Sequence, residues 1–162
     1  MPEFEDWVSA RAHVLMRFAF LVTGNAADAD DALQEALISA YQRWDVVAGA
    51  VDPDAYVRRM IVNAHTSWWR RFRRRETPVD VAWSPALAGV DAPAEDVQRM
   101  WGLCGELPAR QRVAIVLRYY EGMQYGEIAE ILDCSEGTVR SQVHRALATL
   151  RRRLDGEDAA DA

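Results

Sequence analysis

Residues 125–154 read YGEIAEILDCSEGTVRSQVHRALATLRRRL, and this stretch decides how the second half of the chain folds. Its apolar residues recur at helical spacing in a short run over 125–132 and in a longer run that begins at Glu136. The polar residues 133–135 separate the two runs and predict a tight turn. Two helices joined by so short a turn are typical of a helix-turn-helix motif.

The two faces of this motif differ in chemistry. The residues expected to close its small core are Ile128, Ala129, Leu132, Val139, Val143, Ala146 and Leu150. The outward residues of the second helix, which could reach the major groove of DNA, are Thr138, Arg140, Ser141, His144 and Arg145. Asp133 stands where many such motifs have glycine, and aspartate tolerates the left-handed conformation better than most residues. Gln124 is a weak N-cap where serine or threonine would be expected.

The charge of the chain is divided into blocks, although its formal net charge is only −6. Residues 55–75 carry seven arginines and no acid, and residues 140–154 carry five arginines and no acid. Residues 1–54, by contrast, carry ten acids and three arginines. One basic block in each half of the chain indicates two separate contacts with a polyanion.

Composition favours an all-α protein. Half of the 162 residues are hydrophobic, so the chain can bury a core and is not expected to be disordered. Alanine, leucine and arginine are abundant, while runs of β-branched residues are scarce. No apolar run approaches the length of a membrane span, and the N-terminus lacks the layout of a signal peptide. We therefore expect a cytoplasmic protein with no membrane insertion.

Neither the cysteines nor the histidines form a recognisable reactive site. Cys104 and Cys134 form no CxxC spacing, which fits buried thiols in a reducing compartment better than a disulfide or a metal site. His13, His65 and His144 fall on three different predicted helices, and the chain contains no HExxH motif and no glycine-rich phosphate loop. The sequence thus predicts no enzyme, no metal and no cofactor.

The acidic first part of the chain predicts two helices. Apolar spacing predicts a helix over 4–22, which the residues Thr23-Gly24-Asn25 end. A second helix is expected to begin near Asp28, with carboxylates in its first turn where they suit the helix dipole. Its buried stripe is expected to contain Leu33, Leu37, Ala40, Tyr41 and Trp44. The segment VVAGAV, residues 46–51, is expected to leave the helix.

A third helix is expected from Asp52-Pro53, an N-cap followed by proline at the first helical position, to about Arg75. Its buried side should contain Val57, Ile61, Ala64, Trp68 and Phe72. The opposite side gathers Arg59, Asn63, Thr66, Arg70, Arg73 and Arg74. Trp69 falls between the two sides, so it either packs in the domain or stacks on an unpaired base.

Residues 76–94 separate the halves with a proline-containing stretch of little periodicity, which predicts a flexible linker. It carries Trp83, which is expected to pack on a domain or on a partner. After the linker, a short helix around Trp101 and Cys104 is followed by another that begins at Leu107-Pro108 and that Gly122 ends. We expect two small helical domains over 1–75 and 95–154, the linker over 76–94 and an acidic tail over 155–162.

Three stretches in this order are similar to conserved regions of one family. ELPARQRVAIVLRYYEGMQYGEIAEILDCSEGTVRSQVHRALATLRRRL (106–154) resembles the fourth conserved region of sigma factors. DADDALQEALISAYQRW (28–44) and DAYVRRMIVNAHTSWWRRFRRR (54–75) resemble parts of their second region. The chain therefore resembles an extracytoplasmic-function RNA polymerase sigma factor of the sigma-70 family, of the actinobacterial sigma-E-like group, which lacks the first and third regions.

The resemblance implies a protein that binds core RNA polymerase and directs promoter-specific transcription initiation, with an anti-sigma factor as a further partner. Asp31, Gln34 and Glu35 match the segment that binds the clamp helices of the polymerase β′ subunit. Residues 47–54 match the loop that captures a flipped base of the minus-ten promoter element. The helices before Glu136 match the part that meets the polymerase β flap.

The resemblance also assigns DNA contacts to both halves. The residues that match the helix that reads and holds the melted minus-ten region are Asn63, Arg70, Arg71, Arg73 and Arg74. We add Arg59 from the same face and Trp69 as the candidate for stacking on a base. The helix from Glu136, with the five outward residues named above, matches the reader of the minus-thirty-five element.

Other classes of function explain less of the chain. An autonomous helix-turn-helix regulator would account for residues 95–154 and leave the first domain without a role. A protein-only interaction module, such as an antagonist of a sigma factor, would not need two arginine faces. An enzyme would need a constellation of reactive residues that the order of the chain does not suggest.

Overall fold

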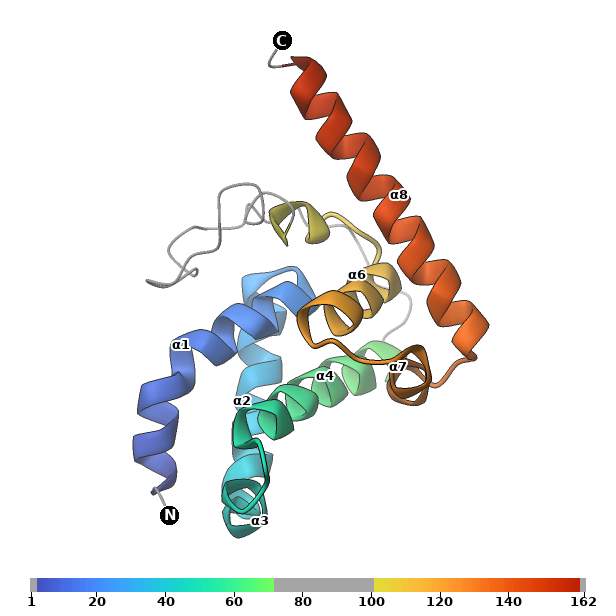
Figure 1. Cartoon of the computed structure of the whole chain (residues 1–162). Coiled ribbons are helices and arrows are strands. Elements are labelled where there is room, and N and C mark those ends of the chain that lie inside the picture. The colour runs from blue at the N-terminus through green and yellow to red at the C-terminus, as the bar shows by residue number, and fades with distance from the viewer. Residues whose placement is uncertain (1–2, 72–100, 161–162) are drawn as a thin grey trace.

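The computed structural model describes residues 3–71 and 101–160, and these described residues form helices and contain no strand (Figure 1). The all-α prediction is confirmed. The helices are α1 (Phe4–Thr23), α2 (Ala26–Gln42), α3 (Trp44–Ala48), α4 (Pro53–Arg71), α6 (Ala109–Ile115), the π-helical turn η2 (Val116–Tyr120), α7 (Tyr125–Leu132) and α8 (Glu136–Ala160). The predicted linker, including Trp83, lies outside the described residues.

The junction between α1 and α2 follows from local chemistry. Gly24 ends α1 in the left-handed conformation, at φ 78°, and its N–H donates to the carbonyl of Phe20 at 2.8 Å. The side chain of Asn25 accepts a hydrogen bond from the N–H of Asp28 at 2.8 Å and caps α2. The expected start of this helix near Asp28 is therefore wrong by two residues, because Asn25 is the N-cap and Ala26 begins the helix.

The end of α2 also departs from the prediction. Of the expected buried stripe, Leu33 and Ala40 are buried and Leu37 and Trp44 are half-buried. Tyr41 is 62% exposed, because the buried face of α2 runs through Ala36 and Ala40. Its ring lies edge-on against Phe4, with ring centroids 5.2 Å apart. The residues from Trp44 to Ala48 form the short helix α3, although the sequence predicted that the chain leaves helical structure from residue 46.

Helix α4 begins as predicted. The carboxylate of Asp52 accepts a hydrogen bond from the N–H of Ala55 at 3.0 Å, and Pro53 is the first residue of the helix. Val57 and Ile61 are fully buried. Thr66 was expected on the exposed side, but it is buried, and its hydroxyl donates to the carbonyl of Val62 at 2.9 Å. The helix is described to Arg71, and the remaining residues of the predicted helix, 72–75, lie outside the described residues.

The second half forms the predicted helix-turn-helix. α7 spans the expected residues. The carboxylate of Glu127 accepts a hydrogen bond from the N–H of Gln124 at 3.0 Å, and this bond stabilises the start of the helix, where Gln124 is a weak N-cap. Asp133 takes the left-handed conformation, at φ 53°, as its small polar side chain permits. Ser135 then caps α8 by accepting from the N–H of Thr138 at 3.1 Å. The residues expected to close the core are buried except Leu132, which is half-buried.

The two halves lie against each other (Figure 1). In the first half, α2 packs against both α1 and α4, and in the second half α8 packs against both α6 and α7. α6 also contacts α1, and α7 contacts α4, so the cores of the halves join in one apolar cluster. None of the described helices is both long and apolar enough to cross a bilayer.

Candidate nucleic-acid and polymerase interface

The first turns of α8 present the polar face that the sequence predicted. Arg140, Ser141, His144 and Arg145 are exposed, and Thr138 is half-buried. On the opposite side of the same helix, Val139 and Val143 are buried where α8 packs on α6 and α7, and so fix its rotation about its own axis. The helix is therefore held by its apolar side while its polar side faces outward, which is the arrangement a major-groove reader needs.

Two of these side chains have partners within the motif. The hydroxyls of Thr138 and Ser135 are 2.9 Å apart and hydrogen-bonded. A guanidinium nitrogen of Arg140 lies 3.8 Å from a carboxylate oxygen of Glu136, one turn earlier, and both side chains are more than half exposed. An exposed ion pair of this kind contributes about 1 kcal/mol or less, so a phosphate group could displace Glu136 at small cost.

A basic groove that the sequence did not predict lies beside this face. It is lined by Tyr125, Arg140, Ser141, Val143, His144 and Leu147. The guanidinium carbon of Arg118 lies 4.4 Å from the ring centroid of Tyr125, and that of Arg140 lies 5.2 Å from the same ring. Arg118 comes from η2, seven residues before Tyr125, and no periodicity in the sequence predicts this contact. Two arginines therefore lie against the ring of Tyr125, and one of them, Arg140, also lines the groove.

The face of α4 is described in part. Arg59 and Asn63 are exposed, as expected for residues that contact DNA. The backbone of Trp69, Arg70 and Arg71 continues the helix, but their side chains lie outside the described residues, as do Arg73 and Arg74 entirely. Asn63 lines a hollow between α4 and α2 whose other lining residues are Glu35, Ala36, Ser39, Arg43, Met60 and Ala64.

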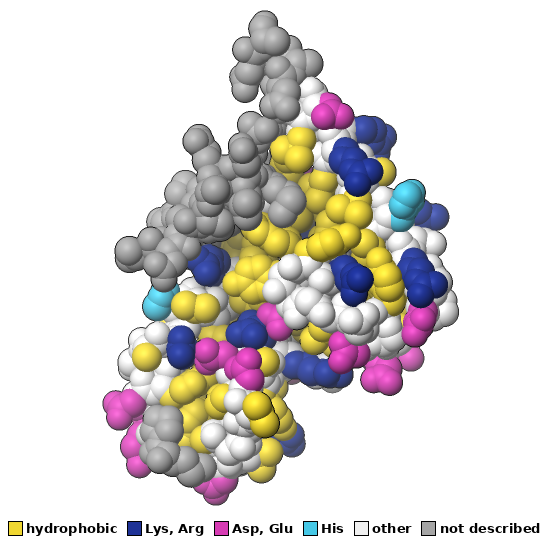
Figure 2. All heavy atoms as spheres, viewed as in Figure 1, with side chains coloured by type: hydrophobic (Ala, Val, Ile, Leu, Met, Phe, Trp, Pro, Cys, Tyr) yellow, Lys and Arg dark blue, Asp and Glu magenta, His cyan; other side chains and the backbone are white. Residues whose placement is uncertain are grey.

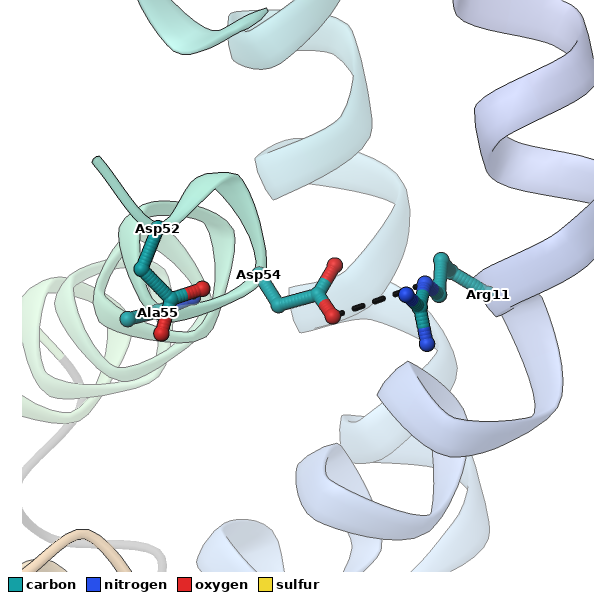
Figure 3. Close-up of polar contacts among 4 residues, drawn as sticks. All are labelled: Arg11, Asp52, Asp54 and Ala55. Carbon is teal, nitrogen blue, oxygen red and sulfur yellow. Dashed lines mark hydrogen bonds and ion pairs between the residues drawn. The ribbon is translucent and has the colours of Figure 1, made fainter. Parts of the chain in front are cut away.

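Polar contacts at the start of α4 hold the end of the loop predicted to capture a base. A guanidinium nitrogen of Arg11 in α1 lies 3.4 Å from a carboxylate oxygen of Asp54, while Asp52 caps the helix at Ala55 (Figure 3). Within the same segment, Val47 is fully buried and Val51 is fully exposed. The segment 47–54 is therefore anchored at both ends and presents an apolar side chain to solvent between them.

The three residues matched to polymerase binding lie together on one exposed side of α2. Asp31, Gln34 and Glu35 are all exposed, and the amide of Gln34 donates to the carboxylate of Asp30 at 2.9 Å. One turn further along the helix, Ile38 is 60% exposed. An apolar side chain next to exposed carboxylates is a usual composition for a protein-binding surface.

The charges of the two halves are distributed as the sequence blocks predicted. Figure 2 shows basic side chains spaced along the α8 side of the molecule, and acidic side chains both at its lower end, where α1 begins and α3 lies, and around α7 beside the start of α8. The exposed arginines of α8 are Arg140, Arg145, Arg151, Arg152 and Arg153. The anionic end of the molecule would repel DNA, whereas the α8 side would attract it.

The cysteines and the buried histidine are placed for packing. Both cysteines are free thiols, and burial raises the pKa of Cys104 to about 12 and also raises the pKa of Cys134. Burial, helped by the positive charge of Arg112, lowers the pKa of His65 to about 4. No group of three or more potential metal ligands occurs among the described residues.

Comparison with known proteins identifies a family for each half. Residues 7–76 match the family model described as sigma-70 region 2, and residues 98–150 match the model described as sigma-70, region 4.

Curated relatives match along most of the chain. The RNA polymerase sigma-E factor of Streptomyces avermitilis is 37% identical over 156 residues, which cover 96% of this chain and 87% of the relative. The protein called ECF RNA polymerase sigma factor SigL, from Mycobacterium tuberculosis, is 33% identical over 147 residues, which cover 86% of this chain and 82% of the relative.

Solved structures with the same arrangement of helices include two sigma factors. RpoE of Bartonella quintana, crystallised with the anti-sigma factor NepR, superposes with a TM-score of 0.63 at 26% identity, and the match covers 94% of this chain and 96% of that one. The extracytoplasmic-function sigma factor SigJ of Mycobacterium tuberculosis superposes with a TM-score of 0.59 at 28% identity and covers 92% of this chain and 54% of that one.

Proposed function

Because this chain belongs to the extracytoplasmic-function sigma factors of the sigma-70 family, which direct transcription initiation by RNA polymerase, we propose that its two halves divide that work. The first half, residues 1–75, binds core polymerase and holds the melted minus-ten region. The second half, residues 95–154, reads the minus-thirty-five element. Residues 76–94 link them.

The observation that carries this proposal is the separation of charge between two exposed helix faces. α8 presents arginines on the face opposite its buried valines, and α2 presents exposed carboxylates beside its contact with α4, where Glu35 and Asn63 line one hollow. Arginines on one face neutralise phosphates and give an affinity that falls with salt. Carboxylates on α2 repel DNA and favour a basic protein surface, and we assign Asp31, Gln34 and Glu35 to the clamp helices of the β′ subunit.

The DNA contacts divide in the same way. On α8 we assign base-edge and phosphate contacts to Thr138, Arg140, Ser141, His144 and Arg145. On α4 and the residues after it we assign contacts with the melted strand to Arg59, Asn63, Trp69, Arg70, Arg71, Arg73 and Arg74. Arg118, which stacks on Tyr125, adds a phosphate contact beside α8.

The partners follow from this division. Core RNA polymerase and promoter DNA are the two obligatory ones, and the protein acts in the cytoplasm, where both are found. An anti-sigma factor is a third partner, suggested by the solved relative that was crystallised with one. The role requires no catalysis by this chain. An autonomous regulator would leave the exposed α2 face without a purpose.

Transcription in vitro with purified core polymerase and a promoter library tests the proposal. Glu35→Ala and Gln34→Ala should weaken capture of core polymerase, while Glu5→Ala, which removes an exposed acid on α1, serves as the matched control and should not. Arg140→Ala and Arg145→Ala should leave that capture unchanged and lower use of the minus-thirty-five element by about 5- to 150-fold, which corresponds to about 1–3 kcal/mol for each base contact.

Two results would contradict the proposal. One is tight, sequence-specific binding of the free protein to duplex DNA at physiological salt without any effect on polymerase. The other is the same defect in the α2 and the α8 variants in a polymerase pull-down, because the two surfaces would then not be separate.

A further inference from the structure

Two residues, one from each helix of the helix-turn-helix, contact the guanidinium group of Arg140. Its carbon lies 5.2 Å from the ring centroid of Tyr125, the first residue of α7. Its Nη2 lies 3.8 Å from Oε2 of Glu136, the first residue of α8. A guanidinium is planar and can stack on an aromatic face while its N–H groups point at a carboxylate, so the two contacts are compatible.

The ring of Tyr125 is itself held in place. The guanidinium carbon of Arg118 lies 4.4 Å from the centroid of the same ring, and Nη1 of Arg118 donates a hydrogen bond to the carbonyl of Met123 at 2.9 Å. Tyr125 is half-buried and packs against the apolar core. The ring therefore offers a fixed surface to the side chain of Arg140, which is 64% exposed.

The carboxylate of Glu136 occupies a space that Gly126 leaves open. A Cβ atom built on Gly126 would lie 2.8 Å from Oε1 of Glu136, closer than Cβ atoms approach other atoms in proteins. Glycine costs helix stability relative to alanine, and here it is the second residue of α7. The backbone of α7 thus accommodates the carboxylate at the place from which its other oxygen faces Arg140.

We propose that Tyr125 and Glu136 are positioning residues for Arg140, and that together they make this arginine discriminate between minus-thirty-five sequences. This role rests on the proposed function, because it assumes that α8 reads that element. The ring and the carboxylate limit the positions that the guanidinium group can take. Neither residue needs to touch a base for this.

The ring favours specific contacts because of how DNA accepts an arginine. A phosphate accepts a guanidinium group in any sequence, so an arginine that moves freely adds affinity without specificity. A guanine edge accepts it through two atoms in one geometry. Stacking on Tyr125 narrows the orientations of the planar group of Arg140, and an arginine held in one orientation distinguishes the base pair that fits it from the others.

The carboxylate opposes sequence-independent binding. Glu136 is 56% exposed beside Arg140, so it repels a phosphate that approaches this arginine. A base edge carries no net charge and is not repelled in this way. The difference penalises the wrong partner more than the right one, which raises specificity.

Both residues also have ordinary structural roles. Tyr125 packs on the core, and an acid in the first turn of α8, such as Glu136, suits the helix dipole. Loss of these roles would change the stability of the protein. It would not change which base pair is preferred at one position of a promoter, so base preference is the measurement that separates positioning from structure.

A promoter library in which only the minus-thirty-five positions are randomised gives this measurement. Core polymerase with the full-length wild type or a variant transcribes it, and a barcode sequenced in each transcript gives the preference at every base pair. Arg140→Ala identifies the base pairs that this arginine reads. Tyr125→Leu keeps an apolar side chain and should lower the preference at those base pairs by about 2- to 5-fold, the factor expected for one exposed cation–π contact. The other positions should be unchanged.

Two further variants separate positioning from direct contact with DNA. Tyr125→Phe keeps the ring and should retain the wild-type preference, whereas a loss would mean that the hydroxyl contacts DNA and would overturn the positioning role. In an Arg140→Ala background, Tyr125→Leu should have no further effect on preference, because the positioned group is absent. An undiminished effect in that background would equally count against it.

Glu136→Gln tests the carboxylate at an exposed position where the fold is not at risk. It should raise transcription from library members that lack the preferred base pairs by up to about 5-fold, the limit for an exposed ion pair. Gly126→Ala should act in the same direction, because its Cβ displaces the carboxylate. Glu106→Gln is the matched control, since it removes the same charge from an exposed ion pair with Arg153 and should leave the preference unchanged. Wild-type preference in both Glu136→Gln and Gly126→Ala would overturn the role of the carboxylate.

The wild type distinguishes failure of the positioning role from failure of the proposed function. Equal use of all library members by the wild type would reject the assignment of α8 to the minus-thirty-five element, and the positioning role with it. A wild-type preference that Arg140→Ala lowers and Tyr125→Leu leaves intact would reject the positioning role alone. So would a wild-type preference that does not depend on Arg140.

Discussion

The contact between the halves continues the apolar cluster of their interiors and adds buried basic side chains that the rest of each described interior does not contain. Within the first half, Phe18, Val22 and Ile61 are fully buried, and within the second half Leu117, Ile128 and Val139 are fully buried. Of the described residues, the buried basic side chains are His65 and Arg112, and both lie where the halves meet.

This difference indicates that the interior of each half stays intact more readily than the contact between the halves. Exposing buried apolar side chains to water is unfavourable in proportion to the area exposed. Pulling apart the core of one half would therefore remove most of the free energy that keeps that half folded. Charged and polar groups regain hydration when they separate, which offsets much of the cost of breaking their contacts. Contacts between domains of one chain are commonly of this more polar and separable kind. The halves are therefore expected to stay folded when the contact between them opens.

The largest expected effect concerns the interior of the first half. The spacing that buries Val57, Ile61 and Ala64 predicts that Trp68 continues this buried face and that Trp69 lies 100° further around α4. Trp68→Ala should lower the free energy of unfolding by about 3–5 kcal/mol, the usual cost of removing a buried tryptophan side chain. Trp69→Ala should lower it much less and should instead reduce open-complex formation, because a base loses its stacking partner.

Thermal unfolding of both variants measures the expected losses of stability. Permanganate reactivity of unpaired thymines at a known promoter measures the expected loss of open complex. Equal destabilisation by the two substitutions would show that both rings are structural. The arginines would then contact the melted strand alone.

The next effect concerns the contact between the halves. The pKa of His65 is about 4 in the folded protein and about 6.5 in an unfolded chain, so the unfolded state binds the proton first as the pH falls. Stability should therefore be unaffected by His65 above pH 6.5 and should decrease progressively between about pH 6.5 and pH 4, by about 3 kcal/mol in all. The cause is burial first and the charge of Arg112 second, while Asp28 opposes them.

Urea unfolding at a series of pH values measures this decrease. His65→Gln should flatten the dependence between pH 6.5 and pH 4, whereas His13→Gln, which replaces an exposed histidine, should leave it unchanged. A parallel decrease in the wild type and in His65→Gln would mean that carboxylates elsewhere control the acid sensitivity.

The sequence predicted the elements of each half well, because their signals are local. Helix spacing, the Asp52-Pro53 start and the left-handed Asp133 depend on residues within a few positions of one another, and the structure has all three. The start of α2 was predicted near Asp28, but the helix begins at Ala26. Asn25 is its N-cap, because the Asn25 side chain accepts a hydrogen bond from the otherwise free backbone N–H of Asp28.

The contact between the halves could not be predicted in this way. Arg112 reads as one more arginine of a basic chain, and only the packing of α6 on α1 brings it to the carbonyl of Val22. Thr66 is similar, since a polar residue on the expected outer face of α4 is buried once the second half lies there. Arg118, which contacts the ring of Tyr125, lies in a π-helical turn that no spacing rule indicates. The roles assigned to the DNA-facing and polymerase-facing residues remain predictions.

The smallest expected effect tests whether a loss of stability in one half is transmitted to the other half. Asn25 caps α2 in the first half and Ser135 caps α8 in the second, each by accepting one backbone N–H. Asn25→Ala and Ser135→Ala should each lower the free energy of unfolding by about 1 kcal/mol, and Asn25→Ser and Ser135→Thr should retain most of it, because these uncharged side chains also cap helices. Hydrogen exchange followed by mass spectrometry then locates each loss. If the contact is separable, Asn25→Ala should speed exchange in α1 and α2 and leave α7 and α8 as slow as in the wild type, and Ser135→Ala should do the reverse. Faster exchange in both halves from either cap would mean that the halves unfold as one unit, and opening would then require a partner to supply the free energy that holds them together.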